Sequence, residues 1–77
     1  MTRNEFIAEF AELLGVRAEE LRPETEMATI PSWDSVAWLG SLVLIDEKLG
    51  TKVRPEELSG ARTFQDILEA VAAGLEG

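Results

Sequence analysis

The apolar residues of this 77-residue chain recur at helical spacing in three separate segments, and no strand pattern competes with them. Glycines and prolines lie between the segments and interrupt the helical period. The pattern predicts an all-α fold. We expect a small four-helix bundle with three main helices, one short helix and a long loop between helices one and two, in a single domain over residues 1–77.

The first segment predicts a helix over roughly 3–14. Thr2 followed by Glu5 is the pattern of a capping box, and Gly15 is the residue type that commonly ends a helix in the left-handed conformation. Five apolar residues share one face of this helix, which we expect to pack on the core: Phe6, Ile7, Phe10, Leu13 and Leu14.

Residues 15–33 form the long loop, because no period persists there and Pro23 and Pro31 interrupt any helix. Loops of this length are uncommon in small domains unless they are functional or anchored. We expect a short turn over residues 17–21 and a Trp33 side chain that holds the end of the loop on the bundle. Four apolar residues are spaced as further anchors: Val16, Leu21, Met27 and Ile30.

The second helix is predicted to begin at Asp34 and Ser35, both favourable at a helix start, and to run through Leu49 to a stop at Gly50. A helical wheel predicts one core-facing stripe and one adjacent shoulder. The stripe contains Trp38, Leu39, Leu42, Ile45 and Leu49, and the shoulder contains Val36, Gly40, Val43 and Glu47.

Gly40 is unusual inside a helix, where glycine is less favourable than alanine by about 1 kcal/mol. One interpretation is close packing against the long loop. The other is a notch that admits a side chain of a partner protein. The sequence leaves both open.

The rest of the chain predicts one short and one longer helix. Pro55 followed by acidic residues is typical of a first helical turn, and about one turn fits before Gly60. Thr63 with Asp66 is a second capping box. The last helix carries apolar residues at helical spacing: Phe64, Ile67, Leu68, Val71 and Leu75.

The chain contains neither cysteine nor histidine. A disulfide framework, a thiolate nucleophile, a zinc knuckle and the commonest proton shuttle are therefore excluded, and we expect no metal site and no catalytic residue. A small enzyme that uses carboxylates such as Asp34 and Asp46 is the least favoured hypothesis, because the sequence shows no paired acid site.

The net charge of −8, from 15 acidic and 7 basic residues, opposes binding to nucleic acid. Basic protein partners fit this charge better. Residues 1–5 lead directly into a charged amphipathic segment without the apolar region of a signal peptide, and no apolar run approaches membrane-spanning length. We expect a monomeric cytoplasmic protein without membrane insertion.

The acidic excess also predicts a dependence of stability on salt. Like charges repel one another in the compact state, and added salt or a divalent cation screens that repulsion. We expect the melting temperature to rise between about 50 and about 300 mM NaCl, over which the screening length falls below about 10 Å. Thermal melts followed by circular dichroism measure it, and a falling melting temperature would contradict the prediction.

The order of helix, long anchored loop, Asp34-Ser35 at the start of a second helix, one-turn helix and final helix resembles the acyl carrier protein family over nearly the whole chain. Its most telling stretches are residues 33–39, Trp-Asp-Ser-Val-Ala-Trp-Leu, and 44–50, Leu-Ile-Asp-Glu-Lys-Leu-Gly. In that family the serine of an Asp-Ser-Leu motif carries 4′-phosphopantetheine, transferred from coenzyme A by a separate phosphopantetheinyl transferase. The resemblance implies that Ser35 is the acceptor and Asp34 the motif residue before it.

The resemblance further implies a carrier that holds acyl or aminoacyl intermediates as thioesters and presents them to loading, condensing and tailoring enzymes. A helix N-terminus independently suits a phosphodiester, because it offers unpaired N–H groups and the positive end of the helix dipole. Asp-Ser is also an ordinary helix cap. The alternative is therefore a carrier-like helical adaptor that binds a protein partner without being modified.

Two departures from the family pattern concern the expected partner face. Val36 stands where leucine usually follows the serine, and Ala37 and Gly40 occupy positions that are commonly acidic in fatty-acid carriers. Acidic residues return only at Asp46 and Glu47, so docking near Ser35 should depend more on apolar contact through Val36 and Val43. This favours a polyketide, nonribosomal peptide or other specialised biosynthetic pathway over fatty-acid synthesis.

Overall fold

The computed structural model describes residues 1–75, so the last two residues of the predicted domain, 76 and 77, lie outside the described residues. Within residues 1–75 the structure is helical, with one isolated bridge between Glu26 and Thr63 and no β-strand, which confirms the predicted all-α fold. None of these helices is both long and apolar enough to cross a membrane. The elements are α1 (Arg3–Leu14), η1 (Ala18–Glu20), η2 (Met27–Thr29), α2 (Ser35–Leu49), α3 (Pro55–Ser59), α4 (Phe64–Val71) and η3 (Ala72–Gly74).

The ends of α1 and α2 follow the predicted capping chemistry. The Thr2 N–H donates to the Glu5 carboxylate at 2.8 Å, and the Glu5 N–H donates to the Thr2 hydroxyl at 3.1 Å. Gly15 and Gly50 end the two helices in the left-handed conformation, with φ of 70° and 65°. These are backbone angles that residues with a Cβ rarely adopt, so glycine fixes both helix ends.

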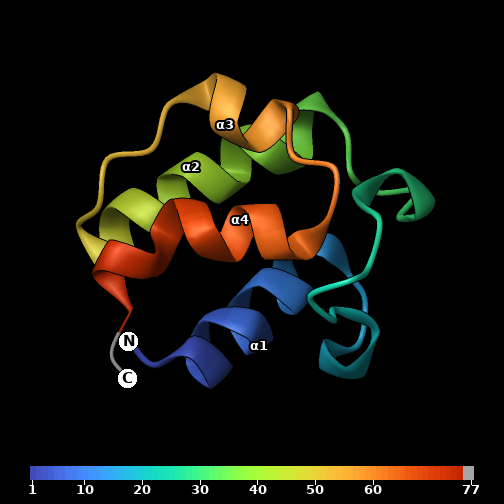
Figure 1. Ribbon diagram of the computed structural model, residues 1–77, viewed down its shortest axis with the longest axis horizontal. Helices are drawn as coiled ribbons and strands as arrows, with labels where there is room; N and C mark the ends of the chain where they lie inside the picture. Colours follow the sequence, from blue (N-terminus) through green and yellow to red (C-terminus); the bar gives the residue numbers. More distant parts are fainter. Residues whose placement is uncertain (76–77) are drawn as a thin grey trace.

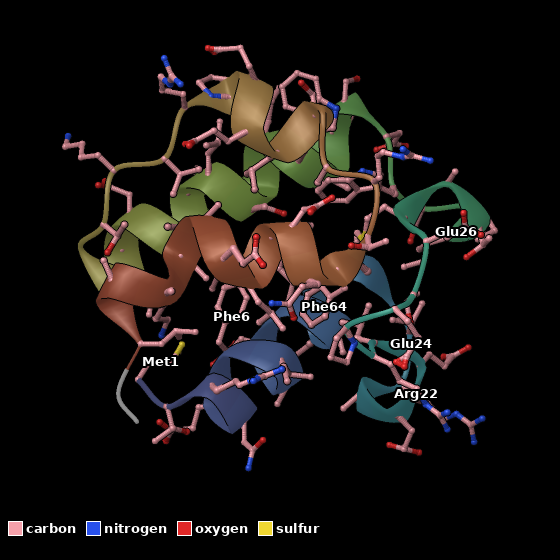
Figure 2. The ribbon with its side chains drawn as sticks, viewed as in Figure 1. Met1, Phe6, Arg22, Glu24, Glu26 and Phe64 are labelled. Carbon is pink, nitrogen blue, oxygen red and sulfur yellow. The ribbon has the colours of Figure 1, made fainter. Side chains whose placement is uncertain are left out.

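The centre of the core is aromatic. In Figure 1 α4 crosses the middle of the molecule, with α1 on one side and α2 and α3 on the other. Figure 2 shows Phe6 and Phe64 between α1 and α4, and the Phe10 ring centroid lies 5.5 Å from each of theirs. Ring pairs at such distances add to the free energy gained by burial alone. The remaining buried apolar residues are Ala11, Leu14, Leu21, Met27, Ile30, Ile45, Leu58, Ile67, Leu68 and Val71.

The long loop is anchored as predicted, and it also pairs with the start of α4. Leu21, Met27 and Ile30 are buried, and Val16 packs against the core. The N–H groups of Phe64 and Gln65 donate to carbonyl oxygens of the loop at 2.9 and 3.0 Å. The loop therefore provides hydrogen-bond acceptors for N–H groups that the first turn of a helix leaves unpaired.

The predicted core stripe of α2 was wrong in one respect, because the helix is rotated about its axis. Leu39, predicted to face the core, is 53% exposed, whereas Ser41 is completely buried. Ile45 is buried as predicted, and the other stripe residues are half-buried. The Ser41 hydroxyl donates to the Ala37 carbonyl oxygen at 2.9 Å, so its burial leaves no unpaired polar group. A helical wheel that classes serine as polar does not predict a buried serine at this position.

Two further expectations were wrong, the burial of Leu13 and the helical conformation of Leu75, although Leu75 does pack against the core. Leu13, placed on the apolar face of α1, is 41% exposed. Leu75, predicted to continue the period of the last helix, lies in extended conformation, because α4 ends at Val71 and passes into the single 3₁₀ turn of η3. The predicted short turn after α1 is present as η1.

Asp66 gives a pH dependence that can be tested. Its carboxylate accepts the N–H groups of Arg62 at 2.9 Å and Thr63 at 3.2 Å, which holds the pKa of Asp66 below its usual value of 3.8. The stabilisation is therefore present above the pKa of the unfolded aspartate and is lost as the pH falls through the lower pKa of the folded state.

We expect Asp66→Ala to lower the free energy of unfolding at about pH 6, and the gap to wild type to close towards about pH 2. Urea melts at a series of pH values measure the gap. Glu24→Ala is the matched control, because Glu24 is exposed in the loop and its carboxylate accepts no hydrogen bond within residues 1–75. A gap for Asp66→Ala that stays constant with pH would contradict the capping role.

Candidate functional site

Ser35 is the first residue of α2 and lies on the surface. Asp34 precedes it as the N-cap in extended conformation, with φ of −132° and ψ of −172°. The Asp34 carboxylate turns back to accept the Ala37 N–H at 2.9 Å, and the Asp34 carbonyl oxygen accepts the Trp38 N–H at 3.0 Å. Asp34 is thus occupied with the helix end, while the Ser35 hydroxyl has no hydrogen-bond partner among residues 1–75.

The start of α2 can accommodate a phosphate group. Of the N–H groups that a helix start leaves without an intrahelical partner, that of Ala37 is satisfied by the Asp34 carboxylate. The Trp38 N–H makes the first regular helix bond, to the Asp34 carbonyl oxygen. The N–H groups of Ser35 and Val36 have no acceptor in the part of the chain that the structure describes. Two free donors and the positive end of the helix dipole favour an anionic group bound at Ser35.

The loop that leads to Ser35 is fixed to α1. The Ser32 hydroxyl donates to the Leu14 carbonyl oxygen at 2.7 Å, across 18 residues of sequence. Trp33 is half-buried, with its ring centroid 5.8 Å from that of Phe10, which confirms the predicted anchor. The Trp33 N–H also donates to the Ile30 carbonyl oxygen at 3.0 Å. The core therefore holds the residues next to Ser35 in place.

The other three serines do not share this environment. The Ser32 hydroxyl is used by Leu14, and Ser41 is completely buried inside α2. Ser59 is exposed but is the last residue of the short helix α3, where the helix dipole presents its negative end. Only Ser35 combines exposure, a free hydroxyl and the N-terminus of a long helix.

The predicted partner residues do not all lie on one surface. Val36 and Val43 are 76% and 56% exposed on α2, and Asp46 and Glu47 are exposed near its end. Ala37 is half-buried and packs against the core, because the rotation of α2 turns it inward. These residues share α2 with Ser35, and their role in binding a partner stays a prediction.

Gly40 faces α1, so the interpretation that placed the long loop against it was wrong. A Cβ atom at Gly40 would lie 3.3 Å from Leu13 Cδ1 and 3.9 Å from Leu13 Cδ2. Glycine at this position lets the Leu13 side chain approach the backbone of α2. The exposure of Leu13 and Leu39 was not predicted. Both leucines lie at the edge of an apolar stripe, where a small rotation of the helix decides whether a side chain is exposed.

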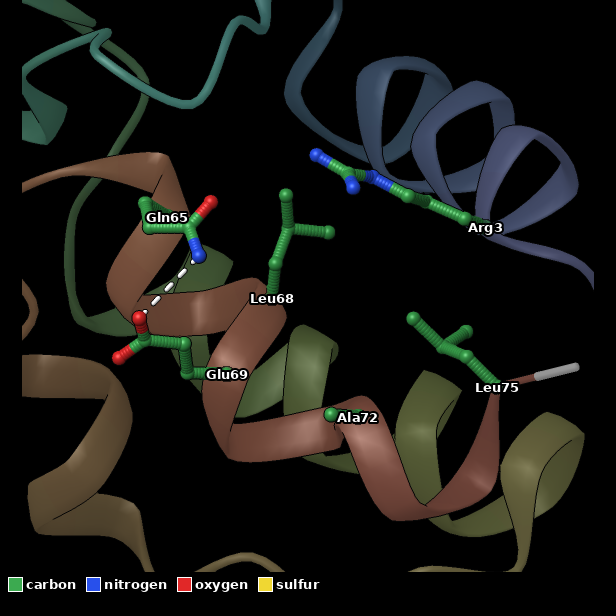
Figure 3. Close-up of a pocket in the computed structure, with 6 residues that line it drawn as sticks. All are labelled: Arg3, Gln65, Leu68, Glu69, Ala72 and Leu75. Carbon is green, nitrogen blue, oxygen red and sulfur yellow. Dashed lines mark hydrogen bonds between the residues drawn. The ribbon is translucent and has the colours of Figure 1, made fainter. Parts of the chain in front are cut away.

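Two surface hollows lie away from Ser35. The first, of about 220 Å³, lies between the start of α1 and α4, where Figure 3 shows Leu68 and Leu75 with Arg3 across from them. Two of its polar residues are paired with each other, because the Gln65 amide donates to the Glu69 carboxylate at 3.1 Å (Figure 3). The second, of about 250 Å³, is lined by Leu42, Asp46, Thr51, Lys52, Val53 and Pro55. Residues 1–75 hold no cluster of three or more carboxylates placed to bind a metal ion.

Comparison with known proteins decides the family. The chain is 34% identical over 70 residues to "Acyl carrier protein MbtL" of Mycolicibacterium paratuberculosis, a match that covers 82% of this chain and 79% of that protein. The chain belongs to the acyl carrier protein family. No family model matches the chain.

Other acyl carrier proteins match a similar part of the chain. The "Meromycolate extension acyl carrier protein" of Mycolicibacterium smegmatis is 31% identical over 71 residues, which is 87% of this chain and 72% of that protein. The protein of the same name from Mycobacterium leprae is 31% identical over 72 residues, and the match spans 88% of this chain but only 63% of that relative. The similarity thus covers most of the helical domain, including the second helix.

Proposed function

We propose that this acyl carrier protein carries 4′-phosphopantetheine on Ser35, attached by a separate phosphopantetheinyl transferase with coenzyme A as donor. The observation that carries the proposal is the exposed, unpaired hydroxyl of Ser35 at the start of a long helix, directly after a capping aspartate. When bound, the group supplies a terminal thiol, which the cysteine-free chain lacks.

The chain's own residues would hold and present this group. The N–H groups of Ser35 and Val36, which have no acceptor within residues 1–75, would favour the negative charge of a phosphodiester on Ser35. Ser32 and Trp33 fix the preceding loop to α1, so the attachment point keeps its orientation when an enzyme docks. Because these residues provide binding and orientation but no proton transfer, we propose a carrier and not an enzyme.

The cargo is proposed to be an acyl or aminoacyl group held as a thioester. Tethering raises its effective concentration at successive enzymes that load, condense or modify it. The uncharged first part of α2 and the relatives named for meromycolate extension support a specialised biosynthetic pathway, of the polyketide, nonribosomal peptide or a related type. Leu42, on the same helix as Ser35, lines a hollow in which part of a cargo could rest.

A direct test is to incubate the purified protein with coenzyme A and a broad-range phosphopantetheinyl transferase. We expect the intact mass to rise by one phosphopantetheine, and peptide mass spectrometry to place the addition on the segment that contains Ser35. An unmodified protein, under conditions in which a known carrier is fully modified, would refute the proposal.

The second candidate is an adaptor that binds a partner without modification. It is favoured by the exposed apolar residues on α2, such as Val36 and Val43, since they could form an interface whether or not Ser35 is modified. The intact mass of protein purified from its native host separates the two. A protein that is unmodified in its host and still binds its partner normally would favour the adaptor.

A further inference from the structure

The 3₁₀ turn η3 packs very closely against the end of α2. A Cβ atom at Gly74 would lie 2.9 Å from Leu49 Cβ and 3.3 Å from Thr51 Cβ, and it would overlap the Thr51 hydroxyl oxygen. Any side chain at Gly74 would therefore force η3 away from the end of α2, because Leu49 Cβ is fixed to the helix backbone. Figure 1 shows this turn, in orange-red, beside the start of the loop between α2 and α3 at one edge of the molecule.

Residues 51–53, the first part of that loop, are held by side-chain packing. No backbone hydrogen bond of Thr51, Lys52 or Val53 occurs within residues 1–75. Val53 packs against the core, Thr51 is half-buried and Lys52 is exposed. A segment without backbone hydrogen bonds opens at low cost in free energy, so its packing contacts decide its position.

The same three residues form part of the wall of the second surface hollow, which has a volume of about 250 Å³. The other lining residues are Leu42 and Asp46 of α2 and Pro55 at the start of α3. Asp46 and Lys52 carry opposite charges, so the lining has no net charge and suits an uncharged apolar molecule. Because Val53 packs against the core, an outward movement of residues 51–53 would extend the hollow towards the core.

We propose that η3 is a latch for residues 51–53. While Gly74 lies against Thr51, this wall stays in place and the hollow keeps its size. When η3 moves away, the wall swings outward and the enlarged hollow admits a small uncharged apolar molecule. Occupancy of the hollow and release of η3 are thereby coupled, and thermodynamic linkage makes the coupling reciprocal. The latch does not require modification of Ser35.

The neutral dye N-phenyl-1-naphthylamine, which becomes fluorescent in apolar surroundings, tests the latch on the unmodified protein. The measured quantity is the dissociation constant of the dye for wild type and for Gly74→Ala. We expect Gly74→Ala to bind the dye about five- to tenfold more tightly, because the wall is open in a larger share of the molecules before binding. Ala73→Ser is the matched control, because it adds one atom to an exposed residue of the same turn, and it should bind the dye as wild type does.

Thr51→Ala shows whether the effect passes through the predicted contact, because it removes the hydroxyl that a Cβ at Gly74 would overlap. In this background Gly74→Ala should change the dissociation constant by about twofold or less, as expected for two residues in direct contact. Equal dissociation constants for wild type and Gly74→Ala would overturn the latch. So would a gain of the same size with and without the Thr51 side chain, or an equal gain in Ala73→Ser, since either would indicate a general loosening of the fold.

NMR relaxation of wild type decides the matter even if thermal melts show that Gly74→Ala is unfolded. The Leu75 N–H donates to the Ala72 carbonyl oxygen at 3.1 Å within the turn, so the Leu75 amide reports release of η3. We expect saturating dye to lower its order parameter from about 0.85 to below about 0.6. The Trp33 amide, bonded to the Ile30 carbonyl oxygen in the long loop, should not change.

An unchanged order parameter at Leu75, or a wild type that does not bind the dye, would overturn the latch. Neither result would affect the proposed function, because dye binding needs neither coenzyme A nor a transferase. Conversely, a wild type that gains no mass with coenzyme A and transferase would refute the proposed function and leave the latch standing.

Discussion

Ser35→Ala is expected to abolish the mass gain with coenzyme A and transferase completely, because no other serine combines a free hydroxyl with the start of a long helix. The Ser35 hydroxyl makes no hydrogen bond in the described chain, and the capping is done by Asp34. The substitution should therefore change the free energy of unfolding by no more than about 0.5 kcal/mol. Intact-mass measurement tests the loss of modification, and urea melts test the unchanged free energy of unfolding.

Ser59→Ala is the appropriate control, since Ser59 is also an exposed serine in a helix. This variant is expected to gain one phosphopantetheine at the wild-type rate. Ser32→Ala is less suitable because the Ser32 hydroxyl holds the loop to Leu14. A mass gain that persists in Ser35→Ala would show that the acceptor is another residue.

Phe10→Ala is expected to leave the protein largely unfolded at room temperature. Phe10 is fully buried, and its ring lies 5.5 Å from Phe6, 5.5 Å from Phe64 and 5.8 Å from Trp33. Removing a buried phenylalanine side chain costs about 3–5 kcal/mol, which is as large as the roughly 3–5 kcal/mol that a core of this size usually supplies. The chain contains no disulfide that could offset this loss of stability.

Circular dichroism and urea titration measure this prediction, with Leu13→Ala as the control on the same helix. Leu13 is 41% exposed, so its removal should lower the free energy of unfolding much less. A cooperative transition of Phe10→Ala near the wild-type midpoint would show that the aromatic cluster contributes less than its burial indicates.

The sequence predicted the ends of α1 and α2 well because capping is local chemistry. Thr2 with Glu5, Gly15, Asp34 and Gly50 each act within one turn of the chain, and each is found in the predicted role. Ser35 could be selected as the candidate site for the same reason, because Asp34-Ser35 marks a helix start. The family resemblance then added the hypothesis of covalent modification, which a helix cap alone does not indicate.

Side-chain exposure on α1 and α2 could not be predicted as reliably, because it depends on how the two helices face each other. The wheel gave Leu39 to the core and gave Ser41 no role, whereas the close approach of α1 at Gly40 leaves Leu39 exposed and Ser41 buried. The pairing of the loop with Phe64 and Gln65 is also a long-range feature that no local motif indicates.

That pairing has a consequence for how the molecule opens. The loop carbonyls of Pro23 and Thr25 accept the first N–H groups of α4, and the same loop is tied to α1 by Ser32 before it reaches Ser35. A fluctuation that releases the whole loop therefore exposes the Phe64 and Gln65 amides to solvent and frees the segment that leads to Ser35, the proposed attachment site. Hydrogen exchange at those two amides, at the start of α4, should therefore report how often this segment is released.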